Sequence, residues 1–184
     1  MKRISSRDNP DYKALLALAE DPRARRRAAE TLLDGEHLIE DALRNGLMPA
    51  RLIVLEGASG RHAWLDRLPA IERLELTEPL FRKLSPVHAP TGVMAVLGIP
   101  AMARTDAAQA DAGRFVLLLE GVQDPGNLGA ILRSAAATAV DTVILSPGCA
   151  EAWSPKALRG GQGGQFRLRI QKGVDLEDWL AGWS

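Results

Sequence analysis

The chain has 184 residues, 46% of them apolar, a formal net charge of zero and a single cysteine, Cys149. This composition suits one globular domain or two small ones, and it excludes both a disordered chain and a framework of intrachain disulfides. No signal peptide opens the chain and no apolar run approaches the length of a transmembrane helix, so we expect a cytoplasmic protein.

The first 30 residues are locally basic although the whole chain is neutral. Asn9-Pro10 is expected to start one helix, and Asp21-Pro22 to cap a second. The second helix carries four arginines: Arg23, Arg25, Arg26 and Arg27. Two interpretations stay open, a solvated helix face or an arm that contacts phosphates at an RNA site.

Strand and helix patterns alternate from residue 31 to residue 97, which predicts a small α/β unit. Its histidines stand at none of the spacings typical of metal ligands, so we expect structural or solvent roles for His37, His62 and His88. Small, polar, alanine-rich residues follow at 100–114 and are typical of a linker. We therefore expect a domain at 1–99, a linker at 100–114 and a second domain at 115–184. The predicted strands are 31–33, 52–55, 71–76 and 93–97, and the predicted helices are 36–45, 63–68 and 78–84.

The second domain opens with an apolar run at 115–119, which predicts a strand buried on both faces. A dense turn follows at 124–127, then a helical stripe of leucine, isoleucine and alanine, then a second short strand at 142–145. This strand–loop–helix–strand order indicates a parallel sheet, in which ligands bind at the carboxyl ends of the strands.

The loop after the first strand matches neither common phosphate-binding pattern. A Walker loop needs a lysine after its glycines, and a dinucleotide fingerprint needs a different glycine spacing. The polar and glycine residues present are instead Glu120, Asn127, Gly129 and Arg133. Asn127 is expected at the helix start, where it can cap amides or meet a ligand, and Arg133 outside the apolar stripe. Alone, the pattern would favour an N-cap and a surface arginine over a ligand site.

Further along, Ser154 is a natural N-cap with Pro155 at the first helical position. The helix predicted at 156–159 runs into a segment with four glycines in positions 160–164. These glycines indicate a close backbone approach, a flexible loop or the loss of a helix-forming residue. A strand is expected at 166–170 and a last helix at 174–180.

Taken together, these motifs resemble the SpoU/TrmH branch of the SPOUT RNA methyltransferases. The first family motif is similar to residues 119–140, with Asn127, Gly129 and Arg133 in register. The second is similar to residues 154–170 through Lys156, Arg159 and Gly163, but departs from the family at glycines 160, 161 and 164. Residues 29–99 resemble the family's N-terminal substrate-binding domain, which is similar to ribosomal protein L30e.

The resemblance implies an α/β fold with an L30e-like domain before a SPOUT methyltransferase domain. It implies transfer of a methyl group from S-adenosylmethionine to a ribose 2′-hydroxyl of rRNA or tRNA, by a homodimer and without a metal. Arg133 would orient the hydroxyl and the adjacent phosphate, because a guanidinium is hardly ever deprotonated. Asn127 would position the RNA or Arg133, and Glu120 would support the site from the strand end. Lys156 and Arg159 would join the arginines at 23–27 in contacting RNA.

Family members continue through a third motif that forms a knot and lines the cofactor pocket, whereas this chain stops at Ser184. We therefore expect most cofactor-binding residues beyond Ser184, an incomplete methyltransferase domain, and no appreciable binding of S-adenosylmethionine by residues 1–184 alone. The alternative hypothesis is a non-catalytic RNA-binding protein derived from such an enzyme. A nucleotide-binding module of another class is disfavoured by the loop spacings.

Overall fold

The computed structural model describes residues 1–68, 70–85, 87, 90–101 and 115–182. The chain divides into two compact units, Met1–Ile99 and Pro100–Ser184. Most of the expected linker, and His88, lie outside the described residues. No helix in the described ranges is both long and apolar enough to cross a membrane.

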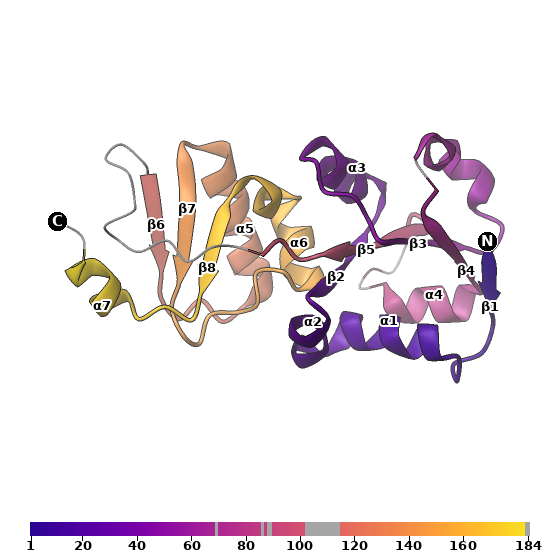
Figure 1. The fold of residues 1–184 in the computed structure, drawn as a ribbon, viewed down its shortest axis with the longest axis horizontal. Coiled ribbons are helices and arrows are strands. Elements are labelled where there is room, and N and C mark those ends of the chain that lie inside the picture. The colour runs from indigo at the N-terminus through magenta and orange to yellow at the C-terminus, as the bar shows by residue number, and fades with distance from the viewer. Residues whose placement is uncertain (69, 86, 88–89, 102–114, 183–184) are drawn as a thin grey trace. The chain divides into compact units, whose positions relative to one another are not determined.

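The first unit is a five-stranded mixed sheet with helices on both faces (Figure 1). The strand order is β1-β4-β3-β5-β2, with β1, β4 and β3 parallel and β5 antiparallel to both of its neighbours. In chain order the elements are β1 (Lys2–Ile4), α1 (Pro10–Glu20), α2 (Pro22–Ala28), β2 (Glu30–Asp34), α3 (Glu36–Arg44), β3 (Arg51–Leu55), a 3₁₀ helix (Ser59–Arg67), β4 (Glu72–Leu76), α4 (Glu78–Leu84) and β5 (Val93–Gly98).

The core of this unit lies between the sheet and the helices α1 and α4. Tyr12 and Leu15 of α1 and Phe81 of α4 pack on Ile53 and Leu74 of the central strands. Successive strand residues point to opposite faces, so α3 buries its own apolar residues against the other side of the sheet (Figure 1). The alternation of strands and helices predicted for 31–97 is confirmed, except that a 3₁₀ helix replaces the α-helix expected at 63–68.

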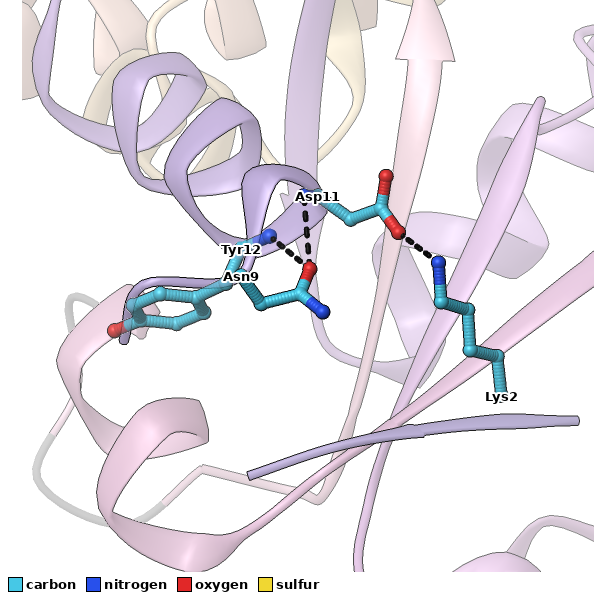
Figure 2. Close-up of polar contacts among 4 residues, drawn as sticks. All are labelled: Lys2, Asn9, Asp11 and Tyr12. Atoms are coloured by element: carbon cyan, nitrogen blue, oxygen red, sulfur yellow. Dashed lines mark hydrogen bonds and ion pairs between the residues drawn. The ribbon is translucent and has the colours of Figure 1, made fainter. Parts of the chain in front are cut away.

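Asn9 fixes the start of α1, as the sequence predicts. Its side-chain oxygen accepts hydrogen bonds from the main-chain amides of Asp11 at 2.9 Å and Tyr12 at 3.4 Å (Figure 2). In the same turn, Lys2 Nζ donates to Asp11 Oδ2 at 2.6 Å, which connects β1 to α1. The Lys2 charge is therefore already paired within the unit.

Two of the three histidines are described, and His62 and His37 take a structural and a solvent-exposed role, respectively. His62 is buried, with Nε2 at 3.1 Å from the carbonyl oxygen of Thr91 and Nδ1 at 3.4 Å from Glu36 Oε2. His37 is exposed. Within the described residues, no group of three histidine, cysteine, aspartate or glutamate side chains could hold a metal ion.

The second unit is a three-stranded parallel sheet in the order β6-β7-β8, so the expected α/β class with a parallel sheet is confirmed. Helices α5 and α6 pack together, whereas Trp179 of α7 packs with Ile144 of β7. In chain order the elements are β6 (Phe115–Leu119), α5 (Pro125–Ala137), β7 (Val140–Leu145), α6 (Pro155–Gly161), a 3₁₀ helix (Gly164–Arg167), β8 (Arg169–Lys172) and α7 (Leu176–Ala181).

Three details of this unit differ from the sequence-based expectations. Strand β6 is not buried on both faces, because within the described residues it pairs only with β7 and its side chains stay partly exposed. The strand expected at 166–170 begins later, because the Phe166 amide bonds back to the Gly163 carbonyl in a 3₁₀ turn. The last helix also begins later, at Leu176, because Asp175 caps it.

Candidate functional site

The loops that follow the three parallel strands are joined to one another at the carboxyl edge of the sheet. The Gly121 amide donates to Ser146 Oγ at 3.1 Å, and the Ala150 amide donates to the Val122 carbonyl at 2.7 Å. The Val174 amide, after β8, donates to the Leu145 carbonyl at 3.1 Å. This edge is where open parallel sheets bind ligands.

Each of these loops contains a glycine in the left-handed region of backbone space. The φ angles are 62° at Gly121, 89° at Gly148 and 67° at Gly173. An added Cβ at any of the three would meet no atom within 4 Å. Space rather than packing therefore surrounds the main chain here, which allows a ligand to approach the backbone closely. The sequence argument used only the first of these glycines, and only to exclude other motifs.

Helix α5 starts three residues earlier than the apolar stripe indicates. Asp124 is the N-cap, and its Oδ1 accepts the Asn127 amide at 2.8 Å. Asn127 thus lies in the first turn of α5, but the prediction that it can cap the helix is wrong because Asp124 does so; a contact with a ligand stays a prediction. The Asn127 side chain is exposed and makes no hydrogen bond to another described residue, and the same holds for Glu120 at the end of β6.

Glycines bring the two motifs into close contact. A Cβ at Gly129 of α5 would collide with the Ala157 carbonyl oxygen of α6 and lie 2.8 Å from the Gly161 nitrogen. A Cβ at Gly160 would lie 3.0 Å from the Gly126 carbonyl oxygen, and one at Gly164 would lie 3.0 Å from that of Leu132. Of the three explanations for the glycine-rich segment, a close backbone approach is therefore confirmed.

The helix contact places Lys156 beside the start of α5. Lys156 Nζ donates to Asp124 Oδ2 at 2.7 Å, across 32 residues of sequence. Arg159 lies three residues further on, hence on the same face of α6 as Lys156. Its side chain is exposed and has no described partner. Sequence reasoning missed Asp124, which it treated only as a turn residue.

The hydrogen bond from Lys156, followed by that from the Asn127 amide, lowers the pKa of Asp124 below its ordinary value of 3.8. The folded state therefore binds this proton less tightly than the unfolded state does. The stabilisation is fully present above the unfolded pKa and is lost as the pH falls through the folded pKa.

We expect Lys156→Gln to raise the pKa of Asp124 towards 3.8, because the lysine is the largest cause of the shift. An NMR titration that follows the Asn127 amide measures this pKa directly. The stability difference between the wild type and the variant should disappear as the pH is lowered through that pKa. An unchanged titration in the variant would contradict the pairing.

Arg133 lies apart from Asn127 on the same helix. The two residues are about 120° apart around the axis and about 9 Å apart along it. The Arg133 side chain is exposed and has no described partner. Its Cα would lie 3.1 Å from a Cβ at Gly164, so the glycine-rich segment packs directly beneath it. The structure thus brings Arg133 to the second motif rather than to Asn127.

In the first unit, the arginines of α2 divide into two kinds. Arg25 is 3% exposed, and its Nη1 donates to the carbonyl oxygens of Leu18 at 2.7 Å and Ala19 at 3.2 Å, at the end of α1. The prediction that Arg25 contacts RNA is therefore wrong, because its guanidinium satisfies carbonyls that a helix end leaves free. The side chains of Arg23, Arg26 and Arg27 are exposed and have no described partner.

Comparison with known proteins yields two family matches. Residues 114–184 match the model of the SpoU rRNA Methylase family, and residues 9–95 match that of the MRM3-like substrate binding domain. The mitochondrial rRNA methyltransferase 3 of Mus musculus is 31% identical over 156 residues, covering 83% of this chain and 37% of that protein. The 23S rRNA (guanosine(2553)-2'-O)-methyltransferase RlmP of Bacillus subtilis (strain 168) is 32% identical over 178 residues, covering 92% of this chain and 64% of that protein. The chain thus spans less than two thirds of either relative.

Comparison with solved structures also finds RNA methyltransferases and SpoU methyltransferases. An RNA 2'-O ribose methyltransferase superposes with a TM-score of 0.76 at 30% identity, covering 98% of this chain and 70% of that one. The SpoU methyltransferase AviRb from Streptomyces viridochromogenes, in complex with the cofactor AdoMet, superposes with a TM-score of 0.78 at 26% identity, covering 94% of this chain and 66% of that one.

Proposed function

Because the chain belongs to the SpoU rRNA methylase family, we propose that the protein transfers a methyl group from S-adenosylmethionine to a ribose 2′-hydroxyl of RNA. The observation that carries the proposal is the contact between α5 and α6. It gathers the two family motifs beside one sheet edge, with exposed side chains at Asn127, Arg133 and Arg159 that have no described partner. The non-catalytic alternative gains no support, since the relatives and structures compared are named as methyltransferases.

In the proposed reaction, side chains of this chain orient the RNA and supply positive charge beside its phosphate. The Arg133 guanidinium holds the 2′-hydroxyl and the adjacent phosphate through its planar fork of donors. It keeps its own proton, so the hydroxyl proton leaves in concert with transfer or through water. Asn127 positions the RNA, and Glu120 supports the site from the end of β6. Holding the reacting atoms in line supplies several kcal/mol, roughly, of the reduction in the barrier.

The cofactor fits the open sheet edge. When bound, S-adenosylmethionine supplies an electrophilic methyl group. The loops that contain Gly121, Gly148 and Gly173 leave main chain accessible after each parallel strand, at the edge where ligands of open parallel sheets bind. These loops are the part of this chain that would meet it.

A homodimer is part of the proposal. Asn127 and Arg133 lie about 120° apart around α5, so the two side chains face different directions. A second copy of the chain would allow Arg133 of one subunit to act with Asn127 of the other.

A cytoplasmic location, suggested by the composition, stays a prediction.

The exposed arginines of α2 are proposed to bind the RNA backbone. Arg23, Arg26 and Arg27 share one face, because they are three and four residues apart. Replacing all three with glutamine should weaken RNA binding at least tenfold. The slope of log affinity against log salt should decrease by about 2, since each single-strand phosphate contact contributes roughly 0.7. Filter binding over a series of salt concentrations measures both quantities.

The matched control for this triple variant uses three cations that are already paired. Lys2 bonds Asp11, Lys13 lies 3.2 Å from Asp8, and Lys83 lies 3.1 Å from Glu20. Changing these lysines to glutamine alters the net charge equally but should leave the salt slope unchanged. If both triple variants change the RNA affinity and the salt slope equally, the α2 arginines form a solvated helix face and do not bind RNA.

The experiment that tests the function is methyl transfer itself. The full-length protein is incubated with rRNA or tRNA and S-adenosylmethionine carrying a labelled methyl group. We expect label in RNA that depends on the protein. RNA that is bound but never labelled would contradict the proposed activity.

A further inference from the structure

We propose that Asp124 is a positioning residue for this reaction. It holds Lys156 of α6 and the first turn of α5 in one arrangement, so that Lys156 and the Asn127 side chain meet the same stretch of RNA. The inference rests on the proposed function.

Both carboxylate oxygens of Asp124 accept a hydrogen bond, one from a residue of the first family motif and one from a residue of the second. Oδ1 accepts the Asn127 amide at 2.8 Å, which fixes the turn that presents the Asn127 side chain. Oδ2 accepts Lys156 Nζ at 2.7 Å, which fixes a side chain that is otherwise 61% exposed. A long lysine side chain at the surface samples many rotamers, and the ion pair restricts Lys156 to one orientation before RNA binds.

The backbone around Asp124 is closely packed. A Cβ at Gly126 would lie 2.9 Å from Asp124 Oδ1 and 3.6 Å from Lys156 Cε, so only glycine leaves room for the carboxylate as it stands. The close α5–α6 contact at Gly129 begins one residue after Lys156, at the Ala157 carbonyl oxygen. The main-chain contact therefore holds the backbones of Asp124 and Lys156 close to each other, while their side chains stay 46% and 61% exposed.

Electrostatics distinguishes a positioning role of Asp124 from a role in RNA affinity. A carboxylate near an RNA-binding surface repels phosphate and cancels the charge of Lys156, so Asp124 cannot serve to strengthen RNA binding. Replacing it with asparagine removes this repulsion and should leave RNA affinity equal or higher. Asparagine is as good an N-cap as aspartate, so the start of α5 is retained. A fall in activity in this variant would therefore come from lost positioning.

The structure offers a closely matched control in the other unit. Lys2 Nζ bonds Asp11 Oδ2 at 2.6 Å, also in the first turn of a helix and also at the surface (Figure 2). The lysine is the largest cause of a lowered pKa for both carboxyl groups. Asp11→Asn thus removes the same kind of ion pair in the unit that lacks the α5–α6 contact.

The first test compares Asp124→Asn with Asp11→Asn in the full-length protein. For Asp124→Asn we expect kcat to fall about tenfold, since small misplacements of reacting groups have effects of this order or more. RNA affinity should be equal or higher, and Tm should change by the same small amount as in Asp11→Asn, since each variant loses one surface ion pair. Asp11→Asn should leave kcat unchanged. A wild-type kcat in Asp124→Asn, or weaker RNA binding that accounts for the whole loss, would overturn the proposal.

The second test is independent of methyl transfer. NMR relaxation of the Lys156 ammonium group and the Asn127 side-chain amide reports their order in residues 1–184. Both groups should be ordered in the wild type, and Lys156 should become mobile in Asp124→Asn. Equal mobility of Lys156 in the two proteins would overturn the proposal. An inactive wild type would contradict the proposed function. The NMR measurement would then still test whether Asp124 orders the Lys156 side chain.

Discussion

Replacing Arg133 with alanine is expected to lower kcat for methyl transfer at least 100-fold while leaving Tm unchanged. The Arg133 side chain is exposed and has no described partner, so its removal leaves no buried group of the described residues unsatisfied. In the proposed site, the same guanidinium orients the reacting hydroxyl and the neighbouring phosphate. Loss of one donor aimed at developing charge typically lowers kcat by about 10²–10³.

Two further variants make the Arg133 experiment specific. Arg133→Lys keeps the charge but loses the planar fork, so it should recover little of the lost activity. Ser134→Ala changes the next residue of α5, whose hydroxyl bonds the Ala130 carbonyl of the same helix at 3.1 Å, and should leave kcat unchanged. Steady-state kinetics with labelled S-adenosylmethionine measure all three variants. Wild-type turnover in Arg133→Ala would remove this residue from the mechanism.

Replacing Gly129 with alanine is expected to destabilise the second unit by about 1–3 kcal/mol, the usual range for overpacking. In an open helix the same change would stabilise by about 1 kcal/mol, because alanine has the higher helix propensity. Here the new Cβ would collide with the Ala157 carbonyl oxygen and lie 2.8 Å from the Gly161 nitrogen. Both are main-chain atoms and cannot rotate away, so the helices must separate.

Thermal denaturation measures this effect, with a decrease in Tm of several degrees per kcal/mol for a unit of this size. Gly60→Ala is the control, because a Cβ at Gly60 meets nothing within 4 Å and its φ is not positive. Its stability should change by less than about 0.5 kcal/mol. A stabilised Gly129→Ala would contradict the close contact between α5 and α6.

The sequence predicted most of the fold because capping and turn residues act locally. Asn9, Asp21 and Ser154 each cap the helix expected of them, and the boundaries of α4 match the predicted range 78–84. The prediction failed at the end of α6. The low helix propensity of glycine argued against a helix through Gly160 and Gly161, yet α6 continues to Gly161. Contact with α5 overrides propensity there, and only the tertiary structure contains that information.

Within the candidate site, the sequence could identify residue types but not their partners. Arg25 resembles its three neighbours in sequence, and only the position of α1 reveals that it binds carbonyl oxygens. Asp124 and Lys156 are 32 residues apart, so no local rule joins them. One signal for Asp124 was present, since an aspartate before Pro125 is a common N-cap. The apolar stripe from Leu128 obscured it.

The most direct test of the account is the identity of the atom that receives the methyl group. RNA methylated by the full-length protein is digested to nucleosides, and the labelled product is identified by mass spectrometry. The account predicts a 2′-O-methyl nucleoside, with the added mass on the ribose fragment. A methyl group on the base would contradict the proposed role of Arg133 and the site built around α5.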